Sequence, residues 1–191
     1  MTAAYLTPTP EAEATRAALA AIVPTLTTER LTLRAPLLSD WETLSPIWRT
    51  DRGQYFGGPF NEEDAWLDFA QLVASWIFRG VGWWTVTLTE TGKPLGVVGI
   101  AAEVGDPEPE MGWLFTQEAE GHGYASEAAR AVHGYAFETM GLKTLVSFID
   151  RKNDRSAALA RRLGAVEDDT VLSPELAAED YCFRHQPETR P

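Results

Sequence analysis

The sequence predicts a single domain of mixed α and β structure, and three observations support this fold class. The chain has 191 residues, of which 45% are hydrophobic and 23% charged, which suits one globular domain with a substantial core. The first half carries two neighbouring β-like runs joined by a turn, which is typical of an antiparallel sheet. The second half carries a strand, a glycine-containing loop and an amphipathic helix between residues 110 and 140.

Residues 1–25 are expected to form an N-terminal appendage, and residues 26–191 the single main domain. An alanine-rich run in the appendage predicts a short helix that ends at Pro24, because proline cannot continue a helix. This helix could pack on a second subunit, so a homodimer is an open alternative.

The first elements of the main domain follow from spacing and capping signals. Leu31 and Leu33 alternate with polar residues and predict a half-buried strand. Ser39 and Glu42 have the spacing of a capping box, which predicts a short helix through Trp48.

A loop, a long helix and a hairpin are expected next. Residues 52–60 hold three glycines and a proline and predict a loop, after which Asn61 is expected to cap a helix. Residues 83–88 and 95–101 are β-like, and the Thr-Gly-Lys turn between them favours a hairpin. The long helix has an apolar stripe of Trp66, Phe69, Val73 and Ile77.

The stretch from residue 110 to residue 140 organises the rest of the chain. It predicts a strand over 110–115, a short loop, and a helix that begins after Gly121 and Gly123, the glycines that flank His122. The helix carries one apolar stripe, and a glycine follows its last residue, as is common at helix ends. The stripe consists of Ala128, Ala131, Val132, Tyr135 and Ala136.

The loop before this helix has the features of a phosphate-binding site. Unpaired backbone N–H groups and the positive end of the helix dipole meet at a helix N-terminus, and glycines let a ligand approach the backbone. Residues 121–126 are therefore candidates for holding a phosphate or pyrophosphate. The alternative is that both glycines serve only a tight turn. The His122 side chain could act on a phosphate, or it could lie in solvent while the backbone alone binds the ligand.

The last part of the chain predicts two more strands and a helix. Residues 144–149 are β-rich, Asn153 is expected to cap a helix that stops at Gly164, and a final strand covers 181–185. Five basic residues and one acid lie between residues 151 and 162, although the chain as a whole is acidic. This local change in the sign of the charge indicates either a binding site for an anionic cofactor or an ordinary solvated helix face.

A dinucleotide-binding βαβ unit is the main rival, since Asp150 follows the second strand where a ribose ligand would be expected. Three observations count against it. Ser126 occupies the place of the third glycine, five residues separate the strand from Gly121, and the βα alternation stops after one more helix.

Charge and cysteine content narrow the class of partner. A net charge of −12 argues against nucleic acids and anionic membranes and is compatible with a cationic substrate. No targeting or membrane-spanning segment is expected, because the apolar run at 17–23 is far too short. The single cysteine, Cys182, allows no internal disulfide, which fits a cytoplasmic protein. We expect no metal.

Several of these segments together resemble the GNAT superfamily of acyl-CoA-dependent N-acetyltransferases, in particular its branch of ribosomal-protein N-terminal acetyltransferases. The resemblance rests on residues 110–129, on 153–156 with 162–165 behind them, and on the opening residues 28–34. It covers most of the main domain and leaves the N-terminal appendage out.

The resemblance implies a six- to seven-stranded mixed, mostly antiparallel sheet, splayed at its centre between the 110 strand and the 144 strand and flanked by helices. The pantetheine arm of the co-substrate acetyl-CoA would lie in this V. The cofactor-binding residues that it implies are Trp113, Leu114 and Phe115 by their backbone; Gly121, His122, Gly123, Tyr124, Ala125 and Ser126 by their backbone N–H groups; and Asn153 and Ser156.

Two positions depart from the family pattern. Glu120 stands where an arginine or glutamine often begins the pyrophosphate motif, so its carboxylate must turn away from the phosphates or cofactor affinity suffers. Ala160 stands where some members carry a tyrosine that protonates the leaving thiolate, so that work falls to Ser156 or to water.

Elementary chemistry defines what acetyl transfer to an amine requires of a site. Acetyl transfer to an amine needs a neutral amine, a stabilised carbonyl oxygen and an accommodated thiolate. Deprotonating a lysine-like amine at pH 7 costs roughly 4–5 kcal/mol, whereas an α-amine costs only about 1 kcal/mol. Glu110, with Glu103 behind it, is the candidate base, and the alternative for each is a solvated carboxylate at a strand end.

The sequence therefore predicts an N-acetyltransferase that moves an acetyl group from acetyl-CoA to a primary amine, either a protein N-terminus or a small amine, by direct attack. A catalytically silent CoA-binding sensor or interaction module is the alternative. The candidates for the wall of an acceptor pocket are Trp41, Trp48, Trp66, Tyr55 and Phe56.

Overall fold

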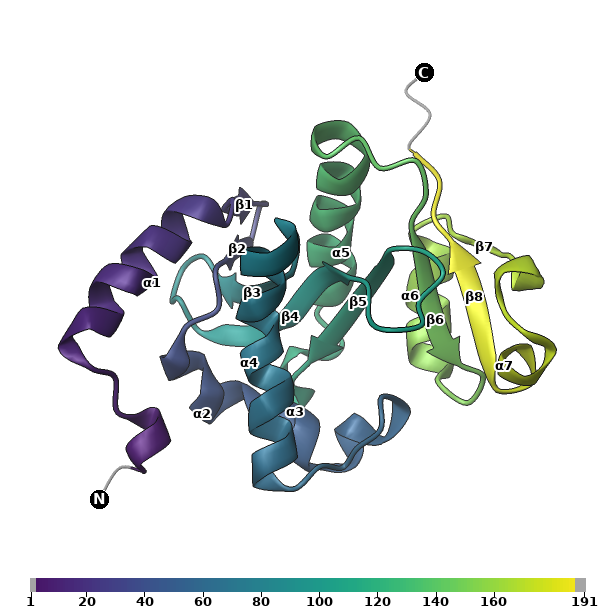
Figure 1. Cartoon of the computed structure of the whole chain (residues 1–191). Coiled ribbons are helices and arrows are strands. Elements are labelled where there is room, and N and C mark those ends of the chain that lie inside the picture. The colour runs from purple at the N-terminus through teal and green to yellow at the C-terminus, as the bar shows by residue number, and fades with distance from the viewer. Residues whose placement is uncertain (1–2, 188–191) are drawn as a thin grey trace.

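The computed structural model describes residues 3–187 and contains one eight-stranded sheet (Figure 1). The strand order is β1-β2-β3-β4-β5-β6-β8-β7, and every neighbouring pair is antiparallel except β5 and β6. The strands are β1 (Leu26–Thr27), β2 (Leu31–Arg34), β3 (Trp83–Leu88), β4 (Pro94–Ala101), β5 (Glu110–Phe115), β6 (Val146–Asp150), β7 (Val166–Glu167) and β8 (Asp180–Arg184). The predicted mixed, mostly antiparallel sheet is confirmed, and the two-residue strands β1 and β7 extend it to eight.

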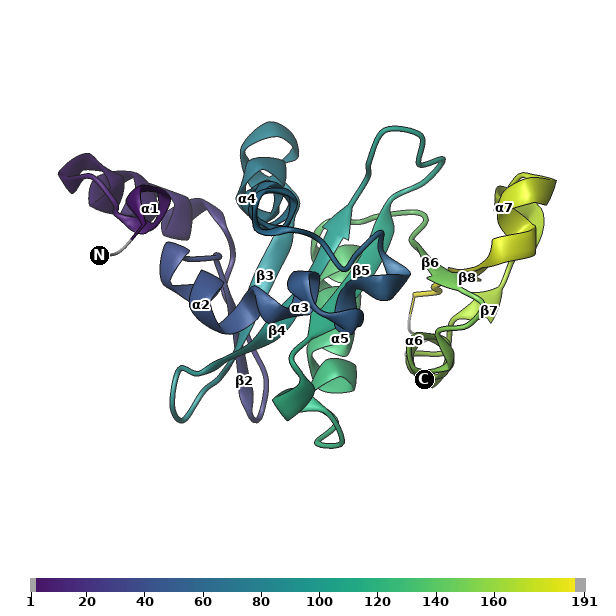
Figure 2. The same cartoon turned by 90° about the horizontal axis from the view of Figure 1, so that it is seen from below.

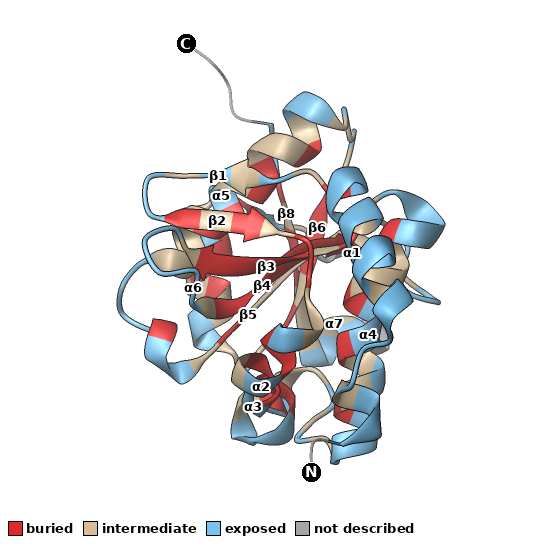
Figure 3. Ribbon diagram, turned by 90° about the vertical axis from the view of Figure 1, so that its left-hand side faces the viewer, coloured by how far each residue is buried: buried red, intermediate tan, exposed pale blue. Residues whose placement is uncertain are grey.

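Helices cover both faces of this sheet (Figure 2). On one face α5 packs against β4 and β5, and on the other α2, α3 and α4 enclose a second apolar cluster. Buried residues concentrate in the central strands and on the inward sides of these helices (Figure 3). The helices are α1 (Pro10–Ile22), α2 (Trp41–Leu44), α3 (Pro46–Arg49), α4 (Glu62–Arg79), α5 (Tyr124–Gly134), α6 (Asp154–Arg162) and α7 (Pro174–Glu179).

Shorter helical turns complete the secondary structure. The chain continues from α5 as a π-helical turn before a glycine with a φ of 68°, Gly141, so the predicted helix end is confirmed. The other turns are 3₁₀ helices: η1 (Ala4–Leu6), η2 (Leu38–Asp40), η3 (Asp51–Tyr55), η4 (Gln117–Ala119) and η6 (Asp169–Val171), with the π turn η5 (Tyr135–Thr139).

The predicted capping box at Ser39 is wrong, because the chain before α2 is held by Asp40 instead. The Asp40 carboxylate accepts the Leu37 N–H at 2.9 Å and thereby holds the η2 turn. Asp40 is buried, and it also accepts bonds from Arg34 (2.7 and 2.8 Å) and from the Thr85 hydroxyl (2.8 Å). A buried carboxylate needs such partners, and they select Asp40 rather than its neighbour for this position.

Helix α4 begins as predicted but is rotated relative to the predicted stripe. The Asn61 side chain accepts the Asp64 N–H at 2.9 Å, which confirms the cap. The Trp76 indole N–H donates to the Trp83 carbonyl (2.9 Å), which turns the face of the helix that contains Trp76 toward the sheet. Ile77 is therefore 68% exposed. The buried residues of α4 are Ala65, Phe69, Leu72 and Trp76.

The sheet splits between β5 and β6, as predicted. These strands share one register pair, Glu110 with Val146. Beyond this pair side chains form the bridges: the Ser147 hydroxyl donates to the Met111 carbonyl (2.5 Å), and the Phe148 N–H donates to the Glu110 carboxylate (3.2 Å). The two strands then diverge toward their carboxyl ends (Figure 1).

A buried histidine supports this join between the two parts of the sheet. The His185 Nε2 lies 3.0 Å from the Ser147 Oγ, and its ring lies 5.7 Å from that of His133 in α5. Because Ser147 donates to a carbonyl, its oxygen is the acceptor for the His185 N–H. Burial, with the nearby His133 as a smaller cause, lowers the pKa of His185 to about 3.

We expect His185 to make the fold sensitive to acid. The unfolded chain binds a proton at this residue near pH 6.5 but the folded protein does not, so stability falls as the pH drops below 6.5. This loss amounts to about 2 kcal/mol between pH 6.5 and pH 4.5. His185→Gln, which keeps a donor for Ser147, should flatten the pH dependence of the urea unfolding free energy over this range. The same substitution at exposed His122 is the control, and equally steep acid loss in both variants would contradict the assignment.

Candidate active site

A cavity of about 780 Å³ opens where β5 and β6 diverge. Its volume is in the range of small-molecule sites. Its walls come from the α3–η3 segment, from β5, from the loop leading into α5, and from α6. The predicted cofactor residues among its lining are Trp113, Leu114, Phe115, Gly121, Gly123, Tyr124, Ala125, Ser126, Asn153 and Ser156. Glu110 and His122 lie outside this lining.

The register of β5 decides which of its backbone groups face the cavity. Leu114 pairs with Val97 of β4, and the Thr116 N–H donates to the Leu95 carbonyl at 2.9 Å. In an antiparallel pair alternate residues bond to the same neighbour, so the even-numbered residues of β5 bond to β4. Trp113 and Phe115 therefore direct their backbone groups toward β6. The backbone role expected for Leu114 is incompatible with this register.

The loop into α5 provides backbone donors at its end. Gly121 and Gly123 have φ angles of 76° and 78°, a region that favours glycine. Helix α5 starts at Tyr124, and no side chain caps this start. Its first-turn N–H groups therefore remain available to a ligand in the cavity.

One arginine far away in the sequence holds this loop from outside. Glu127 in α5 accepts the Arg30 backbone N–H (2.9 Å) and Nε (2.7 Å), and the Arg30 Nη1 donates to the His122 carbonyl (3.0 Å). Burial raises the pKa of Glu127, but hydrogen bonds from Thr28 and Arg30 and the Arg30 charge outweigh it and lower the pKa. No local sequence signal identifies Arg30 as a site residue, because over 90 residues separate it from the loop.

The His122 side chain turns away from the cavity. Its Nδ1 lies 2.7 Å from the Glu120 carbonyl oxygen, and its ring stacks on that of Tyr124 with 5.3 Å between centroids. The exposed imidazole therefore fixes the loop conformation, which matches the alternative in which this side chain does not act on phosphate.

The start of α6 brings Asn153 and Ser156 to the cavity. The Asn153 side chain accepts the Ser156 N–H at 3.2 Å, which confirms the predicted cap. The Trp113 indole N–H donates to the Ser156 Oγ, also at 3.2 Å. Ala160 is fully buried, and Leu159 lines the cavity in its vicinity, so α6 contributes one hydroxyl to the cavity wall.

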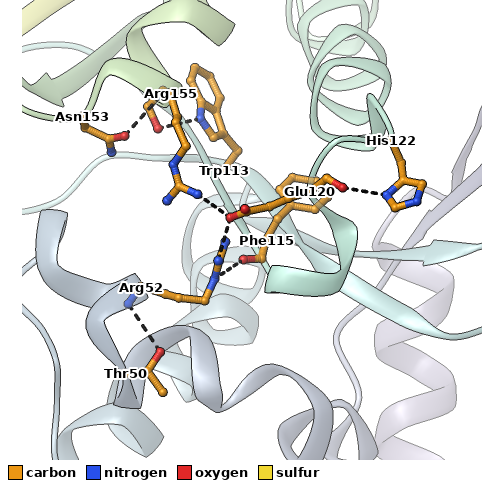
Figure 4. Close-up of polar contacts among 9 residues, drawn as sticks. Thr50, Arg52, Trp113, Phe115, Glu120, His122, Asn153 and Arg155 are labelled. Atoms are coloured by element: carbon orange, nitrogen blue, oxygen red, sulfur yellow. Dashed lines mark hydrogen bonds and ion pairs between the residues drawn. The ribbon is translucent and has the colours of Figure 1, made fainter.

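Of the two outcomes open for Glu120, the structure does not contain the one in which its side chain turns away from the cavity. Its carboxylate lines the cavity and accepts bonds from Arg52 Nη1 (2.7 Å) and from Arg155 (Figure 4). The Arg52 Nε also donates to the Phe115 carbonyl at 2.9 Å. The two arginines neutralise the acid, which explains why it can remain beside the loop. Arg155 belongs to the basic run between residues 151 and 162, whereas no sequence signal indicates a role for Arg52.

Glu110 lies at the join between β5 and β6, where it accepts the Phe148 N–H. Burial is the main cause that raises its pKa to about 7, with additional contributions from the charges of Asp106, Glu103 and Asp180. Glu110 precedes Trp113 by three residues, about 10 Å along a strand. Its side chain and that of Ser156 therefore occupy different parts of the β5–β6 opening.

Aromatic side chains wall the cavity, but only in part the predicted ones. Trp41 and Trp48 are buried in the second apolar cluster, and Trp66 packs on other aromatic rings. Tyr55 and Phe56 do line the cavity, and the Tyr55 hydroxyl donates to the Lys152 carbonyl at 3.2 Å. The η3 segment is thereby fixed to the residues that lead into α6.

Residues 3–187 contain neither a metal-binding cluster nor a membrane-spanning helix. Within that range no group of three or more His, Cys, Asp and Glu residues is placed to hold a metal ion. In the same part of the chain, no helix is both long and apolar enough to cross a membrane.

Residues 30–166, more than half of the chain, match the family described as "Acetyltransferase (GNAT) domain". A solved acetyltransferase from Agrobacterium tumefaciens is 39% identical with a TM-score of 0.80, covering 85% of this chain and 94% of that one. The uncharacterized N-acetyltransferase YnaD of Bacillus subtilis is 26% identical over 145 residues, 73% of this chain and 81% of its own. A ribosomal-protein-S5-alanine acetyltransferase from Vibrio fischeri shares the fold at 18% identity and a TM-score of 0.62, covering 84% and 94% of the two chains.

The Arg30–Glu127 contact gives a test of how the loop is held. Glu127→Ala removes the acceptor of several Arg30 and Thr28 bonds and should lower the unfolding free energy by about 1–3 kcal/mol. Hydrogen exchange of the amides in residues 121–126 should become faster. Glu118→Ala is the matched control, since Glu118 pairs with Lys93 on the exposed surface and its loss should change stability much less than the loss of Glu127. Equal effects of the two variants would refute a bracing role for Glu127.

Proposed function

Because this chain belongs to the GNAT acetyltransferase family, we propose that it moves an acetyl group from acetyl-CoA to a primary amine by direct attack. The observation that carries the proposal is the cavity at the split of the sheet. There β5 turns the backbone of Trp113 away from β4, beside an uncapped helix start. An extended amide-containing chain can pair with such a strand edge, and a diphosphate suits such a helix N-terminus.

The charges of the cavity wall support a donor that carries phosphates. The wall holds three arginines, Arg52, Arg155 and Arg162, against two acids, Glu120 and Asp154. This local excess of positive charge contrasts with a net charge of −12 for the whole chain. The contrast favours an anionic ligand at this place over the alternative of a merely solvated helix face.

In the proposed reaction the amine nitrogen attacks the thioester carbonyl carbon. A C–N bond forms, the C–S bond breaks, and the amine proton passes to a base. The sulfur leaves as a thiolate with the bonding electron pair, and it becomes a thiol by taking a proton from water or through Ser156. Ser156 can assist the departing sulfur, because its Oγ receives the Trp113 N–H and keeps its own O–H for another acceptor. With Ala160 buried, Ser156 is the hydroxyl of α6 that suits this role.

Glu110 is the base in this proposal, and it acts through water because its side chain lies outside the lining of the cavity. A carboxyl group with a pKa of about 7 is substantially ionised at neutral pH and can still take up a proton efficiently. The carboxylates of Asp106 and Glu103 nearby favour a positively charged acceptor, which an amine is before it loses its proton. We propose either a protein N-terminus or a small amine as acceptor and a cytoplasmic location, which suits the single buried Cys182.

The direct test is to incubate the protein with acetyl-CoA and a panel of amines that includes N-terminal peptides, polyamines and aminoglycosides. We expect thiol release that depends on one class of amine, with CoA binding measured in the same samples by calorimetry. Binding without amine-dependent release would favour the silent sensor module instead. Absence of CoA binding would remove the donor from the proposal.

The role of Glu110 predicts a characteristic pH profile. With the acceptor that the panel identifies, the rate should rise with pH through an apparent pKa of about 7 as Glu110 loses its proton. Glu110→Gln keeps an oxygen to accept the Phe148 N–H, and it should lower turnover about 10²-fold and lose this step. Glu103→Gln is the control and should retain the step. A Glu110→Gln enzyme with an unchanged profile would exclude Glu110 as the base.

A further inference from the structure

The cavity contains an internal anion that is held between two arginines. A single oxygen of the Glu120 carboxylate accepts the Nη1 groups of both Arg52 and Arg155 (Figure 4). All three residues line the cavity, and Glu120 directly precedes the loop that starts α5. The carboxylate therefore lies next to the backbone donors to which the proposed function assigns the donor phosphates.

The two arginines reach this point from different walls. Arg52 comes from η3, and its Nε is anchored on the Phe115 carbonyl at 2.9 Å. Its side chain is only 21% exposed, so its Nη groups stay in place when the Glu120 side chain moves. Arg155 lies in the first turn of α6 with its side chain 64% exposed, and it can follow a ligand.

Converging guanidinium groups form an anion site, and the planar arginine fork suits phosphate as well as carboxylate. Burial raises the pKa of Glu120, but the Arg52 hydrogen bond and the charges of both arginines outweigh it and lower the pKa. Glu120 is therefore ionised at neutral pH. As part of the same chain, it occupies the site at a high effective concentration.

We infer that Arg52 and Arg155 bind a phosphate group of the donor, and that the Glu120 carboxylate is an internal stand-in that this phosphate displaces. The inference rests on the proposed function, since it requires a donor with phosphates. A second role for Glu120, as a permanent link between the arginines and the loop, predicts the opposite effect when its charge is removed. The sign of one affinity change therefore separates the two roles.

Glu120→Gln keeps the shape of the side chain and removes its charge. Calorimetric titration of the full-length variant with CoA at low ionic strength should give binding roughly three- to tenfold tighter than wild type, because the internal competitor is weakened. The gain in CoA affinity should be smaller in an Arg155→Gln background, because Glu120 then has only one of its two arginine partners to compete for. Glu118→Gln, two residues earlier and paired with Lys93 outside the cavity, is the matched control and should bind CoA as wild type does.

Equal or weaker CoA binding by Glu120→Gln would overturn the inference and favour the permanent link. A gain of the same size in Glu118→Gln would also overturn it, because the effect would then come from net charge alone. If the wild-type protein binds CoA and Glu120→Gln binds it no more tightly, the inference fails but the proposed function stands. Failure of both proteins to bind CoA would overturn the proposed function together with this inference.

Discussion

The single register pair between Glu110 and Val146 is the constraint on which the rest of the structure depends. Strands that pair once and then separate leave backbone groups without partners, and buried backbone groups require them. Near the pair, the Ser147 hydroxyl and the Glu110 carboxylate substitute for the missing strand bonds. Farther along, Arg52 accommodates the Phe115 carbonyl, and Trp113 faces the opening. The cavity thus forms because the hydrogen-bonded pairing between β5 and β6 is interrupted after one register pair.

Three glutamates around this opening show how local partners set the behaviour of one residue type. Glu127 and Glu120 lie on either side of the phosphate-type loop, and arginines lower the pKa of both. Glu110 has a backbone N–H and other carboxylates as neighbours, so burial prevails and its pKa rises to about 7. The two acids beside arginines stay ionised at neutral pH, whereas Glu110 is left able to exchange a proton in that range. This division supports the roles proposed for them.

Local sequence signals predicted what depends on neighbouring residues. The strand over 110–115, the helix after Gly123 and the Asn153 cap each follow from a few consecutive residues, and the structure contains all three. The resemblance to a family added the split in the sheet. Contacts between distant segments were out of reach of such signals. Arg52 meets Glu120 across 68 positions, and the Gly-rich segment around it indicates a pocket wall only through the aromatic side chains of Tyr55 and Phe56.

The same limit explains the errors in detail. The choice between Ser39 and Asp40 as the cap depends on Arg34 and Thr85, which approach only in the folded sheet. The rotation of α4 likewise depends on the bond from Trp76 to Trp83.

The interrupted ladder has a consequence for cooperativity. Strands β1 to β5 follow one another in space as in sequence, while β6, β8 and β7 form a separate group across the split. We expect each group to behave as its own folding unit, because the strands within a group pair along several residues, whereas β5 and β6 share one register pair. An extended ligand that paired with β5 in the opening would take the place of an absent strand. Occupancy would then merge two units into one, so the ligand would act as part of the sheet as well as a reactant.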